Sequence, residues 1–327
     1  MAPLLRPKAL RKGDVVAVVA ASSGLEEEAA PLLERGVQEI EGLGFEVRAS
    51  PLVAVDRRWW WASAPPDETA EELNRHLRDP EIRAVVALTG GRFTLSYLDL
   101  LDVDAVRADP KPVLGFSDIS ALLLALHART GLVAFHAEIV THGFGEWAEQ
   151  DDARRAQLAD LYRRLLTEDA PLGDLPTGAA WETWRSGKAE GPLIGGMLNR
   201  LVRLQATPSA LAPERFDGAI LFWEEAFTST SGLWNDLHVL RQAGVLDRIS
   251  GMIVGRPFDV ETTTPGPDTL RELVMEVVGD RDLPVLGDVD VGHEGPNLPM
   301  PLGVRAALDA DALTLSLRVP AVTTGER

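Results

Sequence analysis

Short apolar runs that alternate with helical patterns are the feature that most constrains how this chain can fold. The run at 15–21 is followed by a helical pattern through 26–43, a glycine and the short run 45–48. Further apolar runs, at 82–88 and 112–114, end in glycine-containing loops, and the second of these precedes an apolar helical stretch. Parallel strands need such crossover connections, so the first half of the chain predicts an α/β fold with a parallel sheet.

The second half repeats this mixture in a less regular way. Apolar runs at 219–223, 251–254 and 284–287 and an alternating run at 313–319 are interspersed with helical patterns around 232–243 and 268–278. Before them, 167–180 is rich in Pro, Gly and Asp, which is typical of a loop. We therefore expect an N-terminal domain at 1–166, a linker or mobile loop at 167–184, and a smaller α/β or partly barrel-like domain at 185–327.

Composition excludes several classes of protein. With 327 residues, 45% of them hydrophobic, the chain is long enough for more than one minimal core. Its formal net charge of -18 repels polyphosphate, so we expect no nucleic-acid partner and no anionic membrane partner. The absence of cysteine excludes disulfides and thiolate catalysis. No apolar run approaches a membrane span and no secretory signal is recognisable, so we expect a cytoplasmic protein.

Ser117 is the candidate nucleophile, because Gly115-Phe116-Ser117-Asp118 lies between a predicted strand and a predicted helix. A serine on such a sharp turn is exposed, and the free N–H groups of the following helix can bind an oxyanion. The fuller motif has glycine two residues after the serine, where this chain has Ile119. The alternative is that Ser117 or Asp118 only caps the helix.

His293 is the best candidate for a general base. It lies in a loop bounded by Gly and Pro, at 290–296, where an imidazole can be directed toward a ligand. Of the other histidines, three fall in helical patterns and two follow the predicted nucleophile helix, where they could line the ligand crevice without taking part; these are His76, His127 and His238, and His136 and His142.

Glu224 and Glu225 directly follow an apolar run, so one side chain is expected beside the crevice and the other turned away. A carboxylate there could orient the imidazole. A pair could also serve acid–base chemistry or a metal, but without a nearby His or Asp at ligand spacing we expect no metal. For one of the two glutamates, solvated surface charge is the alternative.

The glycine loop at 89–91 and the tryptophan clusters each have two possible interpretations. Thr89-Gly90-Gly91 could cradle a phosphate, although it lacks a nucleotide-binding spacing and a lysine, or it could supply an oxyanion N–H group. Tryptophans 59–61 favour packing or a subunit interface. For Trp181 and Trp184 we favour a place in the core over stacking on a substrate.

These residues belong to blocks that follow one another in a specific order along nearly the whole chain. The blocks are Leu88-Thr89-Gly90-Gly91, Lys111 to Leu123, Glu190 to Gly196, Ile220 to Glu225, Leu240 to Val245, Gly292-His293 and Pro299 to Gly303. In this order they resemble the LD-carboxypeptidase family of serine peptidases, which includes muramoyl-tetrapeptide carboxypeptidases and microcin C immunity peptidases.

The resemblance implies a Rossmann-like N-terminal domain, a C-terminal domain with a small barrel-like sheet, and a homodimer. It implies a catalytic triad of Ser117, Glu224 and His293, without metal or organic cofactor. Main-chain amides that match Gly91 and Asp118 would form the oxyanion hole. Further candidates for substrate contact are Gly90, Glu225, Trp184 and Asn199.

The binding surface departs from the family pattern in two places. Met197 follows Gly195-Gly196 where the family usually has asparagine, and Ala21-Ser22-Ser23 replaces a Pro-Ser pair. The expected activity is hydrolysis of a terminal amide in a small L,D-peptide, such as a cell-wall tetrapeptide, or in a microcin C-like aminoacyl-nucleotide. The forms of the two glycine blocks, 88–91 and 193–196, are closer to the immunity type. A non-catalytic nucleotide or sugar-phosphate binder and an acyl-transfer enzyme are the competing hypotheses.

Overall fold

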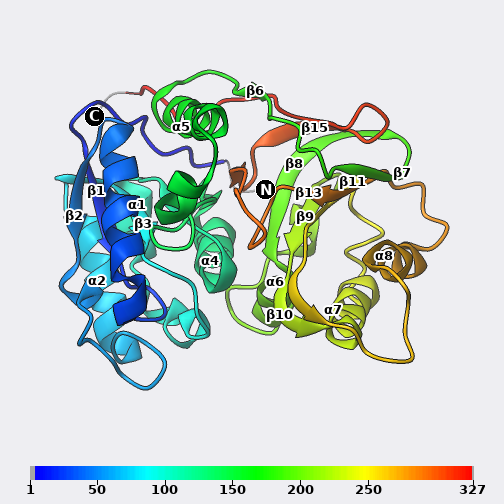
Figure 1. The fold of residues 1–327 in the computed structure, drawn as a ribbon, viewed down its shortest axis with the longest axis horizontal. Helices are drawn as coiled ribbons and strands as arrows, with labels where there is room; N and C mark the ends of the chain where they lie inside the picture. Colours follow the sequence, from blue (N-terminus) through cyan, green and yellow to red (C-terminus); the bar gives the residue numbers. More distant parts are fainter. Residues whose placement is uncertain (1–3, 326–327) are drawn as a thin grey trace.

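The computed structural model describes residues 4–325, which form two halves that lie side by side (Figure 1). The first half is built on a parallel sheet with helices on its faces. Its elements, in chain order, are β1 (Val15–Val19), α1 (Ala30–Gly42), β2 (Glu46–Ala49), α2 (Pro66–Arg78), β3 (Ile82–Ala87), α3 (Val103–Ala108), β4 (Val113–Gly115), α4 (Ser120–Thr130), β5 (Phe135–His136) and α5 (Asp152–Thr167).

The first sheet has the order β14-β5-β4-β3-β1-β2, and β1 to β5 pair in parallel. Every residue of β3 is buried, as expected for a strand covered on both faces. The sixth strand, β14 (Met300–Pro301), comes from the far end of the chain and pairs antiparallel with β5. The second half therefore contributes directly to the first sheet, close to the predicted nucleophile.

The second half is centred on a mixed eight-stranded sheet with the order β6-β16-β15-β8-β9-β11-β13-β7. A separate parallel pair, β10 with β12, lies beside it. The remaining elements are β6 (Gly173–Asp174), β7 (Glu182–Arg185), β8 (Lys188–Met197), α6 (Leu198–Leu204), β9 (Ile220–Glu224), β10 (Ala226–Ser229), α7 (Thr230–Gln242), β11 (Gly251–Gly255), β12 (Phe258–Glu261), α8 (Leu270–Val278), β13 (Val285–Val289), β15 (Arg305–Asp309) and β16 (Thr314–Leu317).

Helix α4 holds the two halves together. Its residues from Ser120 to His127 are all buried, so the helix has no solvent face. One side packs on β4 and β5 of the first sheet and the other on α6 and β8 of the second half. A short helix that is apolar all round is stable only in such a position between two layers. The turn before α4 therefore lies at the junction of the halves.

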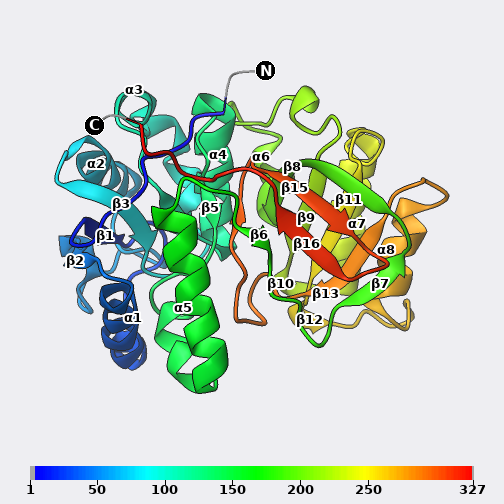
Figure 2. The same ribbon diagram turned by 90° about the horizontal axis from the view of Figure 1, so that it is seen from above.

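The prediction of a linker or mobile loop at 167–184 is corrected, because this segment also contains strand residues. It leaves α5 and contributes β6, which pairs with β16, and most of β7, which pairs with β13. Figure 2 shows that the C-terminal segment also returns to the first half, beside the N-terminal segment. There the N–H of Ala9 donates to the carbonyl of Thr323 over 2.9 Å. The domain boundaries stay a prediction, since strand pairing crosses between the halves.

The α/β fold class is confirmed, with the parallel sheet first and the smaller sheet second. Each apolar run named above becomes a strand. Continuous runs such as 82–88 and 251–254 suit strands covered on both faces, whereas β2, from the run 45–48, is largely exposed. Helix α2 contains His76, which was placed in a helical pattern. The elements that were not predicted are helices α3 and α6 and strands β6, β7, β8, β10, β12, β14 and β15. Among residues 4–325, no helix is both long enough and apolar enough to cross a membrane.

Candidate active site

Ser117 lies directly after β4 and begins a short 3-10 helix that leads into α4. Its φ of +60° is in the left-handed region, which costs a non-glycine residue on the order of 1–3 kcal/mol. The side chains of Ser117 and Asp118 make no capping hydrogen bond at the start of α4, whose N-cap is Ile119. The capping alternative is therefore wrong. The strained turn directs the hydroxyl of Ser117 toward His293.

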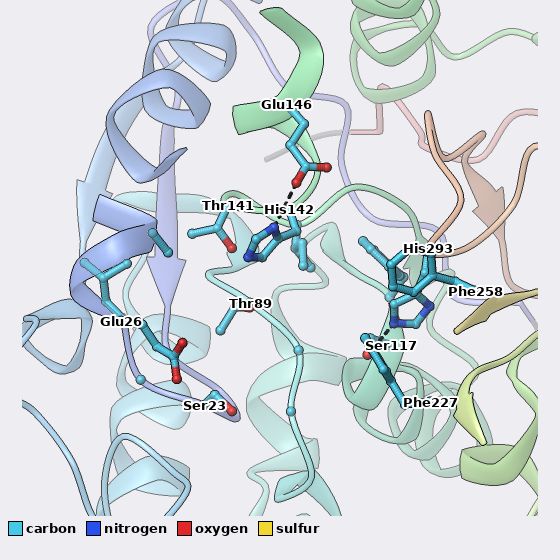
Figure 3. Close-up of a pocket in the computed structure, with 17 residues that line it drawn as sticks. Ser23, Glu26, Thr89, Ser117, Thr141, His142, Glu146, Phe227, Phe258 and His293 are labelled. Atoms are coloured by element: carbon cyan, nitrogen blue, oxygen red, sulfur yellow. Dashed lines mark hydrogen bonds and ion pairs between the residues drawn. The ribbon is translucent and has the colours of Figure 1, made fainter. Parts of the chain in front are cut away.

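His293 connects Ser117 to Glu224. Its Nε2 lies 3.0 Å from Ser117 Oγ, and its Nδ1 lies 2.6 Å from Glu224 Oε2 (Figure 3 shows the first of these contacts). The serine comes from the first half, the glutamate from the end of β9, and the histidine from the loop after β13. The tertiary structure thus brings together three residues that the sequence places far apart, at hydrogen-bonding distances.

The electrostatics of the pair favour a charged glutamate and a basic imidazole. Burial by itself would raise the pKa of Glu224, but the interaction with His293 outweighs burial and lowers it. Burial likewise opposes protonation of His293, yet the carboxylates of Glu224 and Glu225 raise its pKa above the usual value. A histidine with a raised pKa is a stronger base for the Ser117 hydroxyl.

A cavity of 480 Å³ opens directly on Ser117 and His293. One end is bordered by Phe227 and Phe258, whose rings lie 5.6 Å and 6.3 Å from the imidazole between centroids. Away from the serine, Figure 3 shows Ser23, Glu26, Thr89, Thr141 and His142 along the cavity wall, with Glu146 bonded to His142. The cavity is large enough for a small ligand, and its reactive end is partly apolar.

The glycine loop after β3 lies against the nucleophile. A Cβ atom on Gly90 would lie 2.7 Å from Ser117 Oγ, and one on Gly91 would lie 2.4 Å from Ser23 Oγ. Gly91 also has a φ of +147°, in the region that favours glycine. The backbone of this loop therefore comes close to the reacting hydroxyl because both residues lack a side chain.

We expect Gly90→Ala to lower kcat by about 100-fold or more, since a shift of about 1 Å at a reacting group has effects of this size. The added methyl must displace either the loop or the already strained Ser117. The matched control is Gly42→Ala, because a Cβ there meets nothing within 4 Å. Turnover kinetics of both purified variants test this, and wild-type kcat in Gly90→Ala would contradict it.

Asp118 and Arg200 fix this loop from behind. The carboxylate of Asp118 accepts hydrogen bonds from Ser22 Oγ and from the main-chain N–H groups of Phe93 and Thr94, at 2.6 to 2.8 Å. Arg200, from α6 of the second half, donates to Asp118 Oδ1 over 2.5 Å and to the Gly91 carbonyl over 3.2 Å. The ion pair is buried, and it ties the glycine loop, the nucleophile turn and α6 into one unit.

Comparisons with known proteins agree with this arrangement. The LD-carboxypeptidase N-terminal domain matches residues 16–137, and the LD-carboxypeptidase C-terminal domain matches residues 190–308. A putative carboxypeptidase of Vibrio cholerae is 30% identical, over 96% of this chain and 98% of its own length. The chain belongs to the LD-carboxypeptidase family. The prediction of an enzyme, a serine-type peptide hydrolase, is thereby confirmed.

Two other relatives of this LD-carboxypeptidase have more specific names. The microcin C7 self-immunity protein MccF of Escherichia coli is 29% identical, over 94% of each chain. The murein tetrapeptide carboxypeptidase of Pseudomonas aeruginosa is 28% identical, over 91% of this chain and 94% of its own. A solved structure of MccF in complex with glutamyl sulfamoyl guanosine superposes with a TM-score of 0.87 and 26% identity, over 98% of this chain and all of the other.

Glu225 and Asn199 are placed differently from what we expected of this LD-carboxypeptidase. Glu225 is not solvated surface charge, because it is 1% exposed and its carboxylate accepts hydrogen bonds from the N–H and the side-chain amide of Asn199. The side-chain Oδ1 of Asn199 accepts a hydrogen bond from Arg200 Nη1. Both side chains therefore stabilise the position of α6. Neither borders the cavity, in contrast to the substrate contacts that we expected of them. Burial and Glu224 raise the pKa of Glu225 to about 7.

The expectation that Trp184 contacts the substrate is also corrected. It lies in β7, 5% exposed, with its indole directly over Gly287 of the neighbouring strand, away from the cavity lining. Met197 ends β8 beside Glu224 in the sheet register and is buried. Gly90, by contrast, does line the cavity. Trp60 and Trp61 are mostly exposed, so the packing role that we favoured applies only to Trp59, against Phe93.

The two histidines after the nucleophile helix differ in their exposure to the cavity. His142 borders the cavity, as expected, whereas His136 is fully buried behind Phe116 and burial lowers its pKa to about 4. Arg200 and Glu138 were missed, since neither was part of a recognised motif and the sequence does not show which distant groups they contact. Within the described residues, no three His, Asp or Glu side chains are arranged to hold a metal ion.

Proposed function

We propose that this LD-carboxypeptidase is a serine amidohydrolase in which Ser117 is the nucleophile, His293 the base and Glu224 the residue that orients the base. The observation that carries the proposal is the continuous line of contacts from Glu224 Oε2 through both ring nitrogens of His293 to Ser117 Oγ. Three side chains from separate segments, aligned at the wall of a 480 Å³ cavity, match the geometry of nucleophilic catalysis.

The reaction follows from this geometry. His293 removes the proton of Ser117 through Nε2, and the serine oxygen attacks the amide carbonyl carbon. The imidazolium, stabilised by Glu224, returns the proton to the leaving nitrogen as the carbon–nitrogen bond breaks. Water, deprotonated by the same histidine, then attacks the acyl-enzyme ester, releases the acid and restores the serine.

The oxyanion hole is assigned to the main-chain N–H groups of Gly91 and Asp118. The glycine loop and the nucleophile turn are in contact, since a Cβ on Gly90 would lie 3.7 Å from the Asp118 nitrogen. The buried Arg200–Asp118 pair fixes both segments before the substrate arrives. Such fixed donors stabilise developing negative charge without reorganisation.

The substrate class is a small peptide or peptidyl-nucleotide with a terminal amide. Names of relatives support both, a murein tetrapeptide for one and a glutamyl sulfamoyl guanosine complex for another. The cavity favours the second, because its lining contains the carboxylates of Glu26 and Glu146 and, within the described residues, no lysine or arginine. An aminoacyl group brings a free ammonium that these carboxylates attract, whereas a terminal D-amino acid brings a carboxylate that they repel.

Mass-spectrometric product analysis tests this proposal. Wild type and Ser117→Ala are each incubated with an L,D-muropeptide tetrapeptide and, separately, with an aminoacyl-sulfamoyl adenylate. We expect the wild type alone to cleave the adenylate, and an added amine acceptor distinguishes hydrolysis from acyl transfer. Turnover of neither substrate would favour a non-catalytic binding protein, and equal activity of Ser117→Ala would overturn the nucleophile. Homodimer formation and a cytoplasmic location stay predictions.

A further inference from the structure

Glu138 is a buried carboxyl group for which the mechanism above has no use. It follows β5 of the first half and is 2% exposed. Its side chain faces the loop of the second half that carries His293, and both residues border a cavity of 110 Å³. A buried acid next to a catalytic loop calls for a physical explanation, because burying an ionisable group is costly.

The contacts of Glu138 converge on Asn297. Glu138 Oε1 accepts a hydrogen bond from the N–H of Asn297 over 3.1 Å and another from Trp147 Nε1 over 3.0 Å. The Tyr162 hydroxyl accepts from the N–H of Glu138 and donates to the carbonyl of Asn297, over 2.9 Å and 2.8 Å. Asn297 is therefore held at both its main-chain N–H and its main-chain carbonyl by groups of the first half.

Asn297 in turn holds the residue before His293. Its side-chain Oδ1 accepts from the N–H of Gly292 over 2.9 Å. Gly292 packs against Glu224 so closely that a Cβ would lie 2.5 Å from Glu224 Cγ. The residues from 292 to 296 form bends without helix or strand, so no regular hydrogen-bond ladder fixes the imidazole. Arg256 holds the carbonyls of Glu294 and Gly295 after the histidine, and the route from Glu138 through Asn297 holds Gly292 before it.

The surroundings of Glu138 favour its neutral form. Within residues 4–325, no lysine or arginine forms an ion pair with it, and the groups that face it are Trp147 and Glu146 of the 3-10 helix at 144–149, Tyr162 of α5, and His142 and His293 across the small cavity. Burial raises the pKa of Glu138 to about 8, with a further contribution from Glu146. The hydrogen bonds from Trp147 and Asn297 favour the ionised form but do not outweigh burial.

We propose that Glu138 is a positioning residue that holds His293 in line with Ser117 by way of Asn297 and Gly292, through the acceptor oxygen Oε1. This inference rests on the proposed function, since it assigns Glu138 a role in the same reaction. It predicts that kcat depends on an acceptor oxygen at this position and not on the charge of the side chain.

The experiment measures kcat and KM at about pH 7 for wild type, Glu138→Gln and Glu138→Ala, with the aminoacyl-sulfamoyl adenylate as substrate. Glu138→Gln keeps an acceptor oxygen for the N–H groups of Asn297 and Trp147, so it should retain wild-type kcat. Glu138→Ala removes that acceptor, so it should lower kcat on the order of 10- to 100-fold, with a smaller change in KM.

Controls separate this role from general stability. Glu72→Ala removes another buried carboxylate, in α2 of the first half, and should leave kcat unchanged. Circular dichroism checks that every variant is folded. Wild-type kcat in Glu138→Ala, or an equal loss of kcat in Glu138→Gln, would overturn the proposal. Failure of the proposed function gives a different result, namely full activity of Ser117→Ala.

Discussion

Ser117→Ala is expected to lower kcat by about 10⁴-fold or more while substrate still binds. The triad acts as a unit, so loss of the nucleophile removes the acyl-enzyme pathway completely and leaves only the contribution of the oxyanion hole and binding. The fold should persist, because alanine is shorter by one oxygen and that oxygen has a hydrogen bond only with His293 among the described residues. Single-turnover kinetics and isothermal titration calorimetry measure the two quantities separately.

The matched control is Ser209→Ala, which removes the hydroxyl of a buried serine outside the cavity. Its kcat should stay at the wild-type value. If Ser117→Ala retains more than about one hundredth of wild-type kcat, covalent catalysis by this residue is wrong, since general-base catalysis by itself accounts for effects of that smaller size.

Glu224→Gln is expected to lower kcat by about 10³- to 10⁴-fold and to change the pH profile. The glutamine amide can present an N–H group to His293 Nδ1, which turns the imidazole into the tautomer whose Nε2 carries the proton. That nitrogen then faces Ser117 as a donor and cannot act as a base. The 2.6 Å contact between Glu224 Oε2 and Nδ1 fixes the tautomer in the wild type.

The direction of the pH change follows from the pKa of His293. Glu224 raises that pKa, so its removal lowers it, and the acid limb of kcat/KM moves to lower pH. Glu190→Gln, an exposed glutamate of β8 paired with Arg305, serves as a control whose limb should not move. NMR titration of the imidazole measures the same shift directly. An acid limb that stays in place in Glu224→Gln would show that another group controls it.

Protein stability gives an independent check on Glu138. Its pKa is raised above the value of an exposed glutamate, so the folded protein holds a proton that the unfolded chain releases. Stability should therefore fall as pH rises between about 4.5 and 8 and level off above that, and Glu138→Gln should remove this part of the pH dependence. Denaturant titrations at several pH values measure the free energy of unfolding.

The sequence by itself located the strands with long apolar runs and most of the helices. Apolar runs such as 82–88 and 251–254 are recognisable as strands from their composition, because a strand that is buried on both faces is apolar at every position. The turn at Ser117 and the loop at His293 were also predictable, since glycine allows backbone conformations that other residues avoid and proline fixes φ, so both interrupt helices and strands. Local chemistry therefore identified the candidate nucleophile and base.

Only the tertiary structure decided which polar side chains meet. Glu224 and Glu225 are adjacent and both buried, yet one contacts His293 and the other holds Asn199, a difference set by the strand register and by α6. Arg200 and Glu138 reach the site from helix and loop positions that resemble ordinary surface sequence. A buried polar contact depends on where two distant segments pack, and no local pattern records that distance, so these assignments had to come from the fold.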